Sequence, residues 1–228
     1  FRPVRCPLNG KQARGILSLG VSSLITEVSS GIVMLLFNQI LLSLSGNVGV
    51  AAYGIIANLA LIVVSIFTGV AQGIQPIVSR SFGSGQMRHG KQIFHYGVIT
   101  AVAFGLLFLG IGWFFSQPIV GIFNQENNLE MERLASQGLP LYFLAFPMMG
   151  VNILASSYLA SLSKGGPAFV LSVLRGAAAV IPAVLLLSRL FGITGVWLAV
   201  PCAEALTFLV FLAMLPFCFR RPQKGAGA

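Results

Sequence analysis

Residues 28–79, VSSGIVMLLFNQILLSLSGNVGVAAYGIIANLALIVVSIFTGVAQGIQPIVS, contain no Asp, Glu, Lys or Arg. They form an uncharged stretch of 52 residues between Glu27 and Arg80. A helix needs about 20 apolar residues to cross a bilayer, so this stretch and the apolar residues before it are long enough for two spans. The turn residues Ser45-Gly46-Asn47 interrupt the stretch, which predicts that the two helices are joined by a tight turn.

The composition of the whole chain agrees with a membrane protein. Of its 228 residues, 56% are hydrophobic and 8% are charged, whereas about 25% of the residues in a soluble domain are charged. So few charges exclude a soluble enzyme, a disordered tail and a secreted disulfide scaffold. We therefore expect an all-α integral membrane protein.

Four more apolar runs follow Arg80, so that the sequence predicts six transmembrane helices. Each run has roughly 20 to 30 residues and lacks the alternation of a barrel strand, which is only about 10 residues long. We expect a basic linker, a six-helix membrane lobe and a basic tail at residues 1–14, 15–215 and 216–228, with spans near 15–44, 47–79, 93–115, 134–162, 168–187 and 193–215.

The basic residues predict the orientation of the spans. With the amino terminus inside, the inner segments hold eleven of the fourteen Lys and Arg residues: four before the first span, three in residues 80–91, Lys164 and three in the tail. The outer segments hold Arg133 and Arg189. This bias predicts that both termini are cytoplasmic and that the chain lies in the inner (plasma) membrane. Nucleic acid is not an expected partner, because the charges lie in short gaps between apolar runs.

Glu27 is the candidate residue for cation coupling. It lies near the middle of the first predicted span, where a carboxylate must face protein or water. A polar or small stripe at helical spacing leads from it through Ser30 to Asn38. We expect this site to exchange H⁺ or Na⁺. Asn58 and Asn152 are further candidate polar groups of the cation site or pocket.

Glu204 and Arg175 are the other charged residues within spans. Their spans are consecutive and antiparallel, so the two are a candidate ion pair, for which a structural role is the favoured interpretation. Aromatic and methionine side chains predict a pocket for a greasy cation, and its candidate residues are Met34, Phe37, Tyr142, Phe146 and Met149. The sequence has no P-loop and no motif of a hydrolase or a metal site. We therefore expect no enzyme activity and no cofactor, with an ion gradient as the energy source.

Five motifs in order resemble the MATE (multidrug and toxic compound extrusion) transporters, in particular their MepA-like bacterial branch. The motifs are GVSSLITEVSSG at 20–31, VAAYGIIAN at 50–58, GVAQGIQPIVS at 69–79, SSYLA at 156–160 and GITGVWLAVP at 192–201. The similarity extends over about residues 15–215.

The resemblance implies a fold of twelve helices in two lobes, of which this chain is the carboxyl-terminal lobe. It also implies antiport of cationic, amphiphilic drugs against H⁺ or Na⁺, with membrane lipid and an amino-terminal six-helix lobe as partners. Glu27 matches the seventh-helix acid that some members use for coupling. Some members also have an acid on the tenth helix, but residues 134–162 contain none.

Two alternatives stay open. A lipid-linked polysaccharide flippase of the related exporter branch should have a more cationic lumen than Arg175 alone provides. A non-transporting membrane scaffold subunit would bind a stable partner without any efflux.

Overall fold

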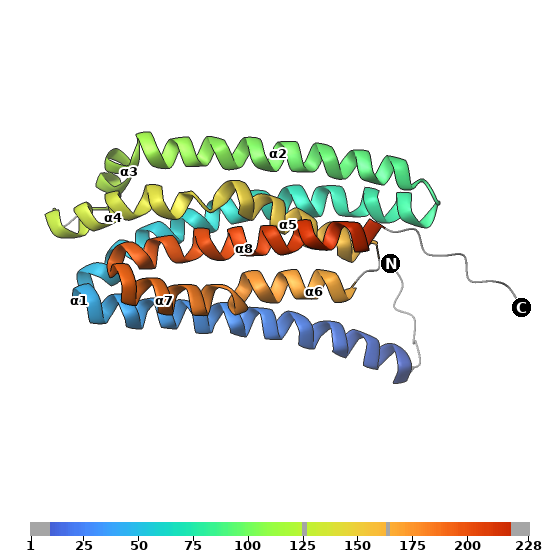
Figure 1. Ribbon diagram of the computed structural model, residues 1–228, viewed down its shortest axis with the longest axis horizontal. Helices are drawn as coiled ribbons and strands as arrows, with labels where there is room; N and C mark the ends of the chain where they lie inside the picture. Colours follow the sequence, from blue (N-terminus) through green and yellow to red (C-terminus); the bar gives the residue numbers. More distant parts are fainter. Residues whose placement is uncertain (1–9, 125–126, 163–164, 220–228) are drawn as a thin grey trace, which may run out of the picture.

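The structure, a computed structural model, describes the backbone of residues 10–124, 127–162 and 165–219 and the side chains of residues 28–124, 127–162 and 165–215. Every regular element in this part of the chain is a helix. Figure 1 shows the helices lying side by side along one long axis. They are α1 (Gly10–Gly83), α2 (Met87–Phe114), α3 (Ser116–Phe123), α4 (Leu129–Phe143), α5 (Phe146–Ser161), α6 (Gly165–Val173), the π-helical turn η1 (Leu174–Ala178), α7 (Val180–Phe191) and α8 (Ile193–Phe219).

Helix α1 is two antiparallel helices joined at Gly46. The helical dihedrals break there, where φ is 61° and ψ is −154°. This conformation is essentially confined to glycine, because a Cβ atom would strain it. The first half of α1 runs along the bundle in one direction and the second half returns beside the other helices (Figure 1). The turn predicted at residues 45–47 is confirmed.

The described helices account for six passages along the bundle. By length and composition, four helices could cross a membrane when α1 is counted once, or five when the bent pair α4 and α5 counts as one span. Because α1 doubles back at Gly46, it supplies two passages rather than one. The short helix α3 contains the apolar residues 118–123.

The fourth span is bent by 48° between α4 and α5. Pro147 lies in the first turn of α5 and has no backbone N–H, so it cannot bond to the carbonyl of Phe143. The chain instead makes a tight turn, in which the N–H of Ala145 donates to the carbonyl of Tyr142 at 3.1 Å. The missing hydrogen bond at Pro147 permits this bend.

The ends of the bundle separate the basic residues as the charge count predicts. The connection between α1 and α2, flanked by Arg80 and Arg88, lies at one end. The connection between α7 and α8, beside Arg189, lies at the opposite end (Figure 1).

Two glycines of α2 allow it to pack closely against the bent span. A Cβ atom at Gly105 would lie 2.6 Å from the Cα atom of Pro147, and one at Gly112 would overlap the ring of Phe143. Gly110, on the same helix, has open space around it. The close approach of α2 to the bent span therefore depends on Gly105 and Gly112 and not on Gly110.

We predict that Gly105→Ala destabilises the protein by about 1–3 kcal/mol, because the new methyl group must displace the backbone of α5. Gly110→Ala is the matched control on the same helix. It should be neutral or stabilising by up to about 1 kcal/mol, because alanine favours the helix and meets no neighbour. Thermal unfolding of both variants in detergent checks this difference, and equal midpoints would contradict the close packing of α2 on α5.

Candidate functional site

A charged network lies inside the helix bundle at Glu204. Nε of Arg175 donates to Oε1 of Glu204 at 3.0 Å. On the other side, Nδ2 of Asn152 donates to Oε2 of the same carboxylate at 2.7 Å and to the backbone carbonyl of Glu204 at 2.9 Å. The structure therefore contains the expected ion pair and adds Asn152 to it, so that η1, α5 and α8 meet at one carboxylate.

The two charged side chains differ in exposure. The side chain of Glu204 is 4% exposed, whereas that of Arg175 is 28% exposed. Asn152 is fully buried, and its Oδ1 is the one buried side-chain polar atom of the described residues that has no hydrogen-bond partner. The carboxylate is thus held from within the protein by an amide, while the guanidinium lies toward open space.

Arg175 projects from the π-helical turn η1. The N–H of Ala179 donates to the carbonyl of Leu174 at 2.9 Å, five residues back. Pro182, in the first turn of α7, lacks the N–H that would bond to the carbonyl of Ala178. The helix is therefore free to widen before Pro182, and such π turns occur frequently at functional sites.

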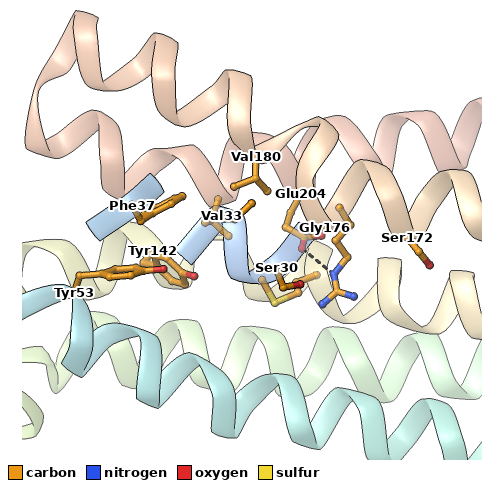
Figure 2. Close-up of a pocket in the computed structure, with 12 residues that line it drawn as sticks. Ser30, Val33, Phe37, Tyr53, Tyr142, Ser172, Gly176, Val180 and Glu204 are labelled. Carbon is orange, nitrogen blue, oxygen red and sulfur yellow. Dashed lines mark hydrogen bonds and ion pairs between the residues drawn. The ribbon is translucent and has the colours of Figure 1, made fainter. Parts of the chain in front are cut away.

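A cavity of about 260 Å³ adjoins the ion pair. Arg175 and Glu204 form one part of its wall. Figure 2 shows aromatic side chains across the cavity from the dashed line that marks the ion pair. The rings of Phe37 and Tyr53 are stacked there, with centroids 5.2 Å apart. Tyr142 and Met149 complete this apolar wall.

A second cavity, of about 600 Å³, shares five lining residues with the first: Ser30, Val33, Tyr53, Tyr142 and Met149. It extends between the two halves of α1. The structure brings several of the predicted residues to its wall: Ser30, Met34, Asn38, Asn58, Tyr142 and Met149. Ser30 and Asn38, two residues of the polar stripe on α1, therefore line this cavity.

Three predicted residues are placed differently from the pocket residues. Phe146 is fully buried and packs against Phe143, with ring centroids 4.4 Å apart, so it belongs to the aromatic core and not to the pocket. It lies just after the bend and lines neither of the two cavities. Asn152 lies behind Glu204. Glu27 lies in helix α1, but its side chain is outside the described residues.

Two features of the site were not predicted from the sequence. One is the place of Tyr53 in the cavity wall, although Tyr53 lies four and five residues before Ala57 and Asn58 on a helix face that lines the larger cavity. The π turn was not expected either. Its signal is the sequence Arg175-Gly176 followed by Pro182, a charge and a helix breaker inside an apolar span.

The arrangement can hold a cation but offers no obvious catalytic chemistry. One carboxylate faces stacked aromatic rings, whose faces attract cations. Among the residues that the structure describes, no group of three or more His, Cys, Asp or Glu side chains is placed to hold a metal ion. The described geometry is thus a paired carboxylate beside a cavity lined partly by aromatic side chains.

Comparison with known families and curated proteins gives consistent matches. The MatE family model matches residues 20–185. Multidrug export protein MepA of Staphylococcus haemolyticus is 27% identical over 199 residues, which is 87% of this chain and 42% of that protein. MepA of Staphylococcus aureus is 26% identical over 211 residues, which is 91% of this chain and 45% of that protein. The chain thus spans about half the length of the curated relatives it matches.

Solved structures show the same fold. The outward-facing form of a multidrug resistance MATE family transporter of the MOP superfamily superposes with a TM-score of 0.83 at 15% identity, over 93% of this chain and 48% of that chain. An inward-facing form gives 0.83 at 16% identity, over 96% and 49%. The Vibrio cholerae MATE transporter VcmN in the bent form gives 0.81 at 18% identity, over 92% and 48%.

We predict that Asn152→Ala destabilises the protein by about 1–3 kcal/mol, because it leaves a buried carboxylate oxygen without its donor. Asn58→Ala is the control: Asn58 is exposed and its Nδ2 donates to the carbonyl of Gly54 in its own helix. That change should stay within about 0.5 kcal/mol. Thermal unfolding in detergent separates the two, and equal effects would contradict a structural role of the amide.

Proposed function

Because this chain belongs to the MatE family, we propose that it forms the carboxyl-terminal lobe of a multidrug efflux transporter. The transporter exports cationic, amphiphilic compounds and takes up H⁺ or Na⁺ in exchange. The relatives that are named multidrug export proteins support efflux as the activity. The amino-terminal six-helix lobe is the proposed partner.

The cavity beside Glu204 is the observation that carries this proposal. It combines one buried carboxylate with the aromatic side chains of Phe37, Tyr53 and Tyr142. A cationic amphiphile needs both parts, a counter-charge for its cationic group and aromatic or apolar surface for its body. The adjoining cavity, lined by Met34 and Met149 among others, has room for the body of a drug-sized ligand.

Alternating access by movement of whole lobes fits the comparisons. The chain resembles an outward-facing and an inward-facing transporter with the same TM-score of 0.83. A lobe that fits both forms supports transport by rocking of one lobe against the other, with little change inside each lobe. The two access states then differ at the boundary between the lobes.

The membrane setting follows from the basic residues. We infer that the lobe spans the plasma membrane with both termini in the cytoplasm, because the end of the bundle with Arg80, Arg88 and Lys91 is the more basic one. Lipid then surrounds the outer helix faces, where large apolar side chains such as Leu35, on the first half of α1, are exposed.

The flippase alternative is less well supported by the cavity. Holding a lipid-linked pyrophosphate requires unpaired cationic groups. In the described part of the chain, the two cavities on either side of Tyr142 have one basic residue in their walls, Arg175, and it is paired with Glu204. The net charge of these described groups is zero.

We predict that Glu27→Gln in the complete transporter abolishes the dependence of ethidium efflux on a proton or sodium gradient. An amide at this position cannot exchange a proton and binds a cation more weakly than a carboxylate does. Efflux from everted vesicles, measured under imposed gradients of each ion, checks this. Glu130→Gln, at the exposed start of α4, is the control and should behave like the unaltered protein.

The outcomes separate two claims. Unchanged gradient dependence in the Glu27 variant would contradict coupling through this residue. Absence of ethidium efflux by the unaltered transporter, together with stable capture of another membrane protein, would instead favour the scaffold alternative.

A further inference from the structure

We propose that the guanidinium of Arg175 is a built-in competitor for the carboxylate of Glu204: it pairs with Glu204 when the cavity is empty and is displaced when an organic monocation binds. The ion pair then links η1 to α8 only while the cavity is empty, and it is an exchangeable part of the binding site. This inference rests on the proposed function, since it requires the lobe to bind a cationic ligand.

The balance of charge around the cavity favours displacement of Arg175 by a bound monocation. In the described residues around the cavity of about 260 Å³, Glu204 and Arg175 neutralise each other. A monocation that entered without displacing Arg175 would leave one excess positive charge in a poorly solvated space, which is costly. A monocation that takes the place of the guanidinium on Glu204 leaves the carboxylate paired.

The position of the Glu204 carboxylate does not depend on Arg175. Asn152 holds Oε2 at 2.7 Å and also the backbone carbonyl of Glu204 at 2.9 Å. Because this amide is fully buried, it fixes the carboxylate from the protein side. Oε1, which Arg175 occupies, is the oxygen available for exchange.

The Arg175 side chain also has a path along which it can move away from Glu204. Its side chain is 28% exposed although that of its partner is 4% exposed. Helical side chains point toward the amino-terminal end of their helix, and here that direction leads past Ser172 toward the end of the bundle with Arg80 (Figures 1 and 2). A long arginine can extend its charged head to the membrane interface along this path.

The π turn allows the Arg175 side chain to move. It holds one residue more than an α-helical turn, so its conversion to α-helical geometry rotates Arg175 relative to α8. Such turns are rare in helices and occur frequently at functional sites. The glycine beside Arg175, Gly176, has open space around it and leaves room for this change.

The ligand that replaces the guanidinium is an organic cation with aromatic or apolar substituents. The opposite wall of the cavity carries Phe37, Tyr53, Tyr142 and Met149. Aromatic faces and a thioether stabilise a delocalised, weakly hydrated cation better than they stabilise Na⁺. Tetraphenylphosphonium has this chemistry and is a suitable probe.

The test is equilibrium binding of tetraphenylphosphonium to the purified complete transporter and its variants. Arg175→Gln should bind the probe at least about tenfold more tightly, because the internal competitor is gone. Glu204→Gln should bind it at least about tenfold more weakly, because the counter-charge is gone. Arg189→Gln, which removes an exposed arginine at the far end of α7, is the matched control and should leave the affinity unchanged.

The double variant Arg175→Gln with Glu204→Gln guards against loss of folding. It leaves no unpaired charge at this site, so it should fold and still bind the probe at least about tenfold more weakly than the unaltered protein does. Weaker or unchanged binding in Arg175→Gln would overturn the proposal, and so would tight binding in the double variant.

Efflux by the unaltered transporter tests the proposed function separately. Efflux combined with unchanged affinity in both single variants overturns the exchange site and leaves the function standing. The predicted pattern of affinities without any efflux supports the exchange site and contradicts the proposed efflux function.

Discussion

A carboxylate in the interior of a membrane bundle has to be neutralised by the protein, and this requirement connects the parts of the lobe. Glu204 receives one donor from Asn152 and another from Arg175. Those donors lie on α5 and η1, so satisfying one charge joins three segments that are distant in the sequence. The backbone irregularities at Pro147 and Pro182 lie close to these donors in the chain. The regular helical hydrogen bonding of the apolar bundle is thus interrupted near the polar side chains that pair with Glu204.

Much of the fold could be predicted from the sequence because hydrocarbon imposes strong constraints. Uncharged runs of the right length identified the spans, and Ser45-Gly46-Asn47 identified the reversal within α1. The bend between α4 and α5 required a further fact, that Pro147 would break the span rather than curve it. Sequence periodicity does not distinguish those outcomes, because the result depends on how α2 packs against the bend at Gly105.

The site was predictable in part. The pairing of Arg175 with Glu204 followed from two opposite charges on consecutive antiparallel spans. Phe146 was expected in the pocket, but aromatic residues are equally suited to a core, and the turn at Ala145 directs it there. The contribution of Tyr53 required knowledge of how the second half of α1 faces the first. The role assigned to Glu27 stays a prediction.

The π turn at Leu174–Ala178 also bears on how this chain aligns with its relatives. A turn with one additional residue absorbs a single-codon insertion locally, so that the residues of α7 downstream keep their neighbours. A relative whose helix is α-helical throughout should therefore align with a gap of one position beside Arg175. Alignments that force a gapless match across this point would assign the wrong counterpart either to the arginine or to Pro182.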